Sequence, residues 1–176
     1  MTPDSLHELF RHMEWADATV WRAVLAHTDA SRDRKLAEWL LHIHQVQRAF
    51  LHIWTNTSMT FRQPSEFPEL PAIQQWAMPY YEEAHRFFTT LDPAALERRV
   101  AMPWVKSFEQ KSGRTFAEPT LAETMFQVTS HSTYHRGQVN ARLRTLGGEP
   151  PLVDFIAWVW FGKPAPEWPA AATQAG

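Results

Sequence analysis

The sequence predicts an all-α protein, a four-helix bundle built from one domain. Apolar residues recur at steps of three and four along four stretches, which is the pattern of helices with one buried face. The chain has 176 residues, a length typical of a single domain whose core needs no metal or disulfide. We therefore expect a domain over residues 1–162 and a poorly ordered tail over residues 163–176.

The first two predicted helices cover residues 3–27 and 33–55. Thr2 and Pro3 suit the cap and the first turn of the first helix. A loop dense in threonine, serine and proline follows the second helix, so the chain cannot turn there as tightly as in a minimal bundle.

The third predicted helix spans residues 72–91, and Pro79 inside it should kink the helix or delay its start. The fourth begins after Thr120, which forms a capping box with Glu123, and ends near Gly147. A short apolar piece over residues 155–161 is expected to cover an end or a side of the bundle.

The segment between the third and fourth helices, residues 92–119, has no helical period. Its two apolar parts flank the run QKSGR, which is typical of a turn. We expect a short β-hairpin here, with Pro103 confining it to an edge.

Composition excludes several classes of protein. Without cysteine there is no disulfide, thiolate nucleophile or cysteine-ligated metal. Seventeen basic and nineteen acidic residues give a net charge of −2, which argues against nucleic acid as a partner. No apolar run is long enough to predict a membrane span, and the first residues do not resemble a signal peptide, so we expect a cytoplasmic protein.

The nine histidines are the feature that composition leaves unexplained. On the fourth helix, His131 and His135 lie at i and i+4, on the side of the apolar stripe. Two imidazoles at this spacing can reach one metal ion. On the second helix, His42 and His44 lie on opposite flanks, each about 90–110° from the apolar stripe. Only one of them can turn towards the other two histidines, and the helical period slightly favours His42.

Three imidazoles from two helices would suit a divalent transition metal with an open fourth position. They favour zinc or nickel, with iron, manganese or copper as alternatives. The same spacing also fits histidines that only hydrogen-bond their neighbours. The remaining histidines are expected to be ordinary, and those at 7, 12, 27 and 85 to be solvated.

Five short runs carry a resemblance to a known family. The run from His131 reads HSTYHRGQV, the run from Leu143 reads LRTLGGEPP, and Asp154 is followed by Phe-Ile. The run from His42 reads HIHQVQRAFL, and Trp15 opens the triplet WAD. Together they resemble the DinB/YfiT-like family over roughly residues 5–160.

The resemblance implies a four-helix bundle that binds a divalent metal through His42, His131 and His135. It implies a homodimer, and an enzyme that acts on a small-molecule substrate, as a hydrolase or as an S-transferase using a low-molecular-weight thiol. Gln47 replaces the glutamate that the family often has, which puts an acid–base role there in doubt.

Gln47, Tyr134, Arg136 and Gln138 are candidates for orienting the metal ligands or contacting substrate. The alternatives are a non-catalytic protein that binds a metal or a small ligand, and a helical interaction module whose histidines are only structural. The catalytic residues stay unassigned.

Overall fold

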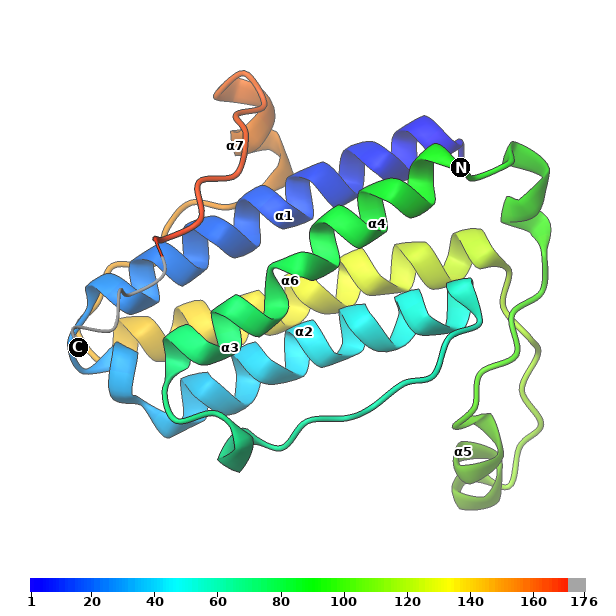
Figure 1. Cartoon of the computed structure of the whole chain (residues 1–176), viewed down its shortest axis with the longest axis horizontal. Helices are drawn as coiled ribbons and strands as arrows, with labels where there is room; N and C mark the ends of the chain where they lie inside the picture. Colours follow the sequence, from blue (N-terminus) through cyan, green and yellow to red (C-terminus); the bar gives the residue numbers. More distant parts are fainter. Residues whose placement is uncertain (171–176) are drawn as a thin grey trace.

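The computed structural model describes residues 1–170, and within them it is all-α (Figure 1). Helices α1, α2 and α6 pack side by side as a bundle. The α-helices are α1 (Pro3–Ala26), α2 (Arg34–Thr55), α3 (Leu70–Ala77), α4 (Pro79–Thr89), α5 (Val105–Ser112), α6 (Leu121–Thr145) and α7 (Phe155–Trp160). Short 3-10 turns lie at Ala30–Arg32, Pro64–Glu66 and Pro93–Glu97.

The long helices begin at residues whose side chains cap them. The Thr2 hydroxyl accepts a hydrogen bond from the Ser5 amide, 3.2 Å away, and an oxygen of Asp33 accepts one from the amide of Leu36 at 2.9 Å. Thr120 and Glu123 form the predicted capping box at the start of α6. Such caps satisfy amides that the first helical turn leaves unpaired.

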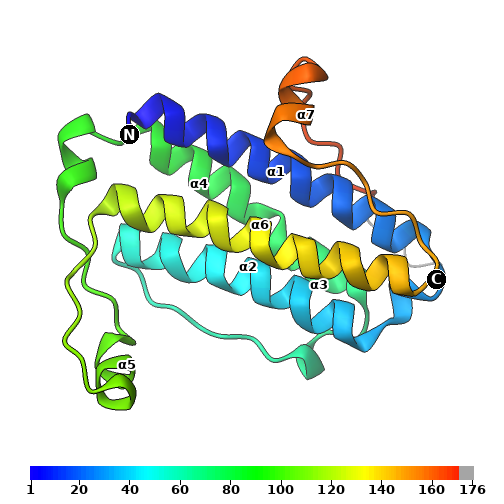
Figure 2. The same cartoon turned by 180° about the vertical axis from the view of Figure 1, so that it is seen from behind.

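The predicted third helix is divided at Pro79 into α3 and α4. Proline has no amide hydrogen and its ring crowds the preceding turn, so the helical ladder is interrupted there. Met78 between the two pieces keeps helical backbone angles, which is why α4 continues roughly onward from α3. The pair packs against α1 and α2, on the side away from α6 (Figure 2).

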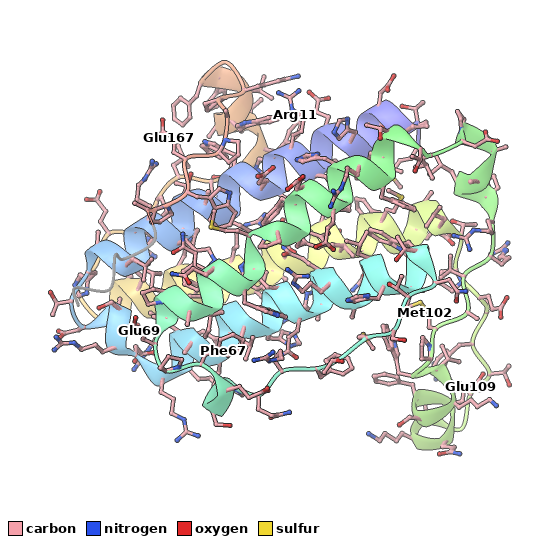
Figure 3. The ribbon with its side chains drawn as sticks, viewed as in Figure 1. Arg11, Phe67, Glu69, Met102, Glu109 and Glu167 are labelled. Carbon is pink, nitrogen blue, oxygen red and sulfur yellow. The ribbon has the colours of Figure 1, made fainter. Side chains whose placement is uncertain are left out.

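The predicted β-hairpin is wrong. Within residues 1–170 there is only an isolated antiparallel bridge between Arg99 and Thr120, and α5 occupies the tip of the segment. Pro119 accepts a hydrogen bond from the Val100 amide at 2.9 Å but has no amide of its own to return the bond, and residues 105–112 carry helix-forming lysine, glutamate and glutamine. Gly113, at φ 67°, ends α5. Figure 3 marks this excursion by the labels on Met102 and Glu109.

The C-terminal part returns to the bundle. The predicted apolar piece forms α7, beside α1 (Figure 1). We expected a poorly ordered tail from residue 163, but up to residue 170 the chain lies against the bundle. Trp168 packs on the core, and the Gln74 side-chain amide donates to the Pro169 carbonyl at 3.0 Å. Burying a large aromatic ring explains this docking. Residues 171–176 lie outside the described part.

The core fills the space between α1, α2, α4 and α6. Its largest fully buried side chains are those of Trp21, Trp158, Tyr80, Phe10, Leu6 and Met13. Among the helices of residues 1–170, none combines the length and the apolar character that crossing a membrane requires.

Candidate metal centre

Three histidines converge at the seam between α2 and α6. His42 comes from α2, while His131 and His135 lie one turn apart on α6, and their ring nitrogens all fall within 4.8 Å of one another. The Nε2 atoms of His42 and His131 are 3.2 Å apart. Two nitrogens bound to one tetrahedral zinc ion lie about 3.3 Å apart, from Zn–N bonds of about 2.0–2.1 Å. The three side chains therefore fit a single ion.

The cluster is open to solvent on one side. His42 is exposed, and His131 and His135 are half-buried. The partial burial comes from the packing of α2 on α6, which Figure 2 shows side by side. An ion could thus enter from the surface, and three protein ligands would leave a position free for water or a substrate.

The surroundings of His131 and His42 favour the neutral form of these two rings. Burial, and then the nearby rings of His135 and His42, lowers the pKa of His131 to about 4. Burial and the His135 ring also lower the pKa of His42. A metal binds the lone pair of a neutral imidazole, so both shifts favour the form that can act as a ligand.

Gln138 fixes the tautomer of His135. The Gln138 Oε1 atom lies 2.7 Å from Nδ1 of His135, and because a carbonyl oxygen only accepts, the imidazole proton lies on Nδ1. The Nε2 lone pair is then free for an ion. The Gln138 amide in turn donates to the Tyr134 hydroxyl at 3.3 Å, and the Tyr134 ring packs edge-on against His135. Gln138 and Tyr134, both candidates from the sequence, thus lie beside His135.

Arg136 and Gln47 lie elsewhere, in a buried polar network below the cluster. The Arg136 guanidinium donates to Oδ1 of Asp17 at 2.7 Å. The Gln47 amide donates to Oδ2 of Asp17 at 2.8 Å and to the Ser132 hydroxyl at 3.1 Å, and the Tyr81 hydroxyl also donates to Asp17. All five side chains are buried. Gln47 and Arg136 therefore hold α1, α2 and α6 together and do not face solvent.

His44 belongs to this network and not to the histidine cluster. Its Nε2 accepts a hydrogen bond from the Trp21 indole at 2.8 Å, and its Nδ1 donates to Oε1 of Gln47 at 2.8 Å. Both ring nitrogens are thereby used, and burial lowers the pKa of His44, which keeps it neutral. Among the two candidates of α2, His42 is the one that faces the α6 pair.

The candidate site residues did not include Asp17, Tyr81 or Ser132, although Asp17 ends the triplet WAD that contributes to the resemblance. A second signal is the position of Asp17 within the mostly apolar buried face of α1. Burial pushes the pKa of Asp17 upward, but the charge of Arg136 and the hydrogen bond from Tyr81 outweigh it and hold the pKa below its ordinary value. His12, expected to be solvated, is also buried, with its ring on the Val153 carbonyl.

Fold and site together define a class: helical-bundle proteins with a three-histidine cluster able to hold a metal at a helix seam. The chain belongs to the DinB family, whose sequence model matches residues 1–165. This confirms the resemblance carried by the histidine motifs. No curated protein matches the chain.

Proposed function

We propose that this chain is a metal-dependent enzyme with the four-helix arrangement of its family, α3 and α4 together forming the fourth member. The observation that carries the proposal is the convergence of His42, His131 and His135 at a solvent-facing seam. Zinc or nickel suits three imidazoles best. A divalent ion held there supplies a Lewis acid at an open position.

The protein's own groups would prepare this site. Gln138 holds the proton of His135 on Nδ1 and so keeps the ring in one orientation. The exposed Tyr134 side chain places a hydroxyl group beside the cluster, where it can hydrogen-bond a substrate. Because the sequence has no cysteine, any thiol chemistry must use a low-molecular-weight thiol as cosubstrate. S-transfer or hydrolysis on a small molecule is the reaction class we propose.

Metal analysis tests the first step. Wild type, His131→Ala and the control His52→Ala would be stripped with a chelator, dialysed against zinc and analysed for ions per chain. His52 lies on α2 with its ring on the Thr57 hydroxyl, away from the cluster. We expect His131→Ala to bind one ion fewer than wild type and His52→Ala to match wild type. Equal binding by His131→Ala and wild type would refute the metal site.

An activity screen tests the second step. Zinc-loaded and nickel-loaded protein would be assayed with several thiols and electrophiles, and with ester and amide substrates, using His131→Ala as the control. Turnover that depends on both the metal and His131 supports the proposal. Absence of turnover with a fully loaded site favours the second candidate, a protein that binds a small ligand without catalysis.

One observation favours that second candidate. A cavity of about 680 Å³ lies between α1, α6 and the segment leading to α7, and Tyr134, Phe126 and His12 are among the residues that line it. This volume is in the range of small-molecule sites. Fluorescence titration of the tryptophans with candidate ligands would detect such binding.

We also propose a homodimer. The side chains of Ile156, Trp160 and Phe161, on and after α7, are 49%, 73% and 59% exposed, and apolar groups gathered in this way commonly mark a protein interface. Light scattering over a range of concentrations tests the proposal, with Trp160→Lys expected to shift the protein towards monomer. A wild-type mass of one chain at all concentrations would refute it.

A further inference from the structure

A second pair of histidines meets on the opposite side of the bundle, where α1 packs on α4. The Nε2 atom of His7 and the Nδ1 atom of His85 are 3.2 Å apart. This is the same separation as that between the Nε2 atoms of His42 and His131. It is likewise close to the distance of about 3.3 Å between two nitrogens on one tetrahedral ion.

Glu14 orients one of these rings. Its Oε2 atom accepts a hydrogen bond from Nε2 of His85 at 2.8 Å, and its Oε1 atom accepts one from the Trp168 indole at 3.4 Å. The proton of neutral His85 therefore lies on Nε2, and the Nδ1 lone pair points at His7. Metal-binding histidines commonly donate their second N–H group to a carboxylate in this way.

The pair opens into a cavity. The space has a volume of about 660 Å³, and His7, Glu14, His85, Trp158 and Trp168 are among the residues that line it. Trp168 belongs to the segment that returns over the bundle after α7. Water or a ligand in this cavity could therefore complete the coordination of an ion held by the two rings.

The neighbouring charges do not exclude a cation. Arg11, labelled in Figure 3, and Arg86 both line the cavity. The Arg11 guanidinium packs over the Trp158 ring at 5.8 Å, and that of Arg86 lies 3.6 Å from a carboxylate oxygen of Glu82. Arg86 is thus paired with a carboxylate, and Glu14, behind His85, offsets the positive charge that Arg11 keeps over the aromatic ring.

We propose that His7 and His85 form a second binding site for a divalent transition metal, oriented by Glu14 and separate from the α2–α6 cluster. Neutral His7 can move its proton from Nε2 to Nδ1, so an ion can replace the hydrogen bond without release of a proton. With two protein ligands, this site is expected to bind more weakly than the three-histidine cluster.

Zinc alone is the probe. Stripped wild type, His7→Ala, His131→Ala, the double variant and His52→Ala would be titrated with zinc by equilibrium dialysis, and circular dichroism would check that each is folded. We expect two ions per chain for wild type and His52→Ala, one for each single variant, and none for the double variant. In the His131→Ala background, Glu14→Gln should weaken the remaining site about tenfold.

The results separate the two sites. If His7→Ala binds as many ions as wild type, with the same affinities, the second site does not exist and the pair is only a hydrogen bond. If His131→Ala loses no ion while His7→Ala loses one, the α2–α6 proposal fails and the second site stands. An unchanged affinity in Glu14→Gln would contradict the orienting role of the carboxylate.

Discussion

Replacing Asp17 with asparagine should destabilise the chain strongly. The side chains of Asp17 and Arg136 are 2% and 3% exposed, and Oδ1 lies 2.7 Å from Nη1. Asparagine keeps the shape but removes the negative charge, which leaves a guanidinium buried without its counter-ion. Breaking a buried ion pair from one side costs about 3–5 kcal/mol. For a chain of this size, each kcal/mol corresponds to about 2–4 °C in melting temperature.

Urea unfolding at pH 7, followed by far-UV circular dichroism, measures this loss. The matched control is Glu38→Gln, because Glu38 pairs with Arg34 at a site where the arginine is 92% exposed, and such surface pairs contribute under about 1 kcal/mol. Adding Arg136→Met to Asp17→Asn removes the unpaired charge and should restore part of the stability. A loss below about 1 kcal/mol in Asp17→Asn would refute the reasoning.

The same pair makes stability depend on pH. The pKa of Asp17 is lower in the folded chain than in the unfolded chain, where it is about 3.9. The stabilisation is therefore fully present above that pH and is lost as the pH falls through the folded-state pKa. Acid unfolding of wild type should be steeper than that of Asp17→Asn.

Three further perturbations test other parts of the structure. Gln138→Leu removes the acceptor for His135 and should weaken zinc binding about 10–100-fold, measured by competition with a chelating dye. In metal-free protein, the free energy of unfolding should fall from about pH 6.5 towards pH 4. The reason is that His131 has a pKa of about 4 in the folded chain, so in this range it is protonated in the unfolded chain only. The variant His131→Asn should flatten this decline in urea titrations. Gly148→Ala should cost about 1–3 kcal/mol, because the added Cβ would lie 2.9 Å from Cγ of the buried Leu143.

Two of these perturbations have a matched control. Gln127→Leu changes an exposed glutamine of the same helix and should leave zinc affinity unaltered, so an equal loss in both glutamine variants would argue against an orienting role for Gln138. Gly137→Ala adds a Cβ with nothing within 4 Å and should be neutral or stabilising. A pH profile unaffected by His131→Asn, or a Gly148→Ala as stable as wild type, would contradict the respective argument.

Apolar spacing and capping residues predicted the long helices well. Thr2 and Thr120 cap α1 and α6 as expected, and Pro79 divides the third helix, because each of these effects depends on local chemistry alone. The hairpin prediction failed because only the base of the segment pairs, at Arg99 and Thr120. Whether the pairing extends into a hairpin depends on the residues between these two positions, and the identities of Arg99 and Thr120 do not determine it. The docking of Trp168 was likewise beyond local pattern, since its partners lie far away in sequence.

The site was predictable where two residues share a helix. His131 and His135 follow from their spacing, whereas the choice between His42 and His44 depends on which flank of α2 faces α6. A helical period cannot show which flank faces α6, and the alignment of this run with the motif of the family favoured His42. The contacts within the buried network were not predictable, because a helical period assigns polar residues to the surface. Asp17 is buried only because partners from three other segments meet it.

The pairing of Asp17 with Arg136 also bears on how the chain assembles during synthesis. The two residues are 119 positions apart, so the carboxylate leaves the ribosome long before its counter-ion exists. Until α6 emerges, docking α1 onto α2 would bury that carboxylate without its counter-ion, which is costly. The charge thus opposes early collapse of the N-terminal half, and we expect fragments that end before residue 136 to stay unfolded.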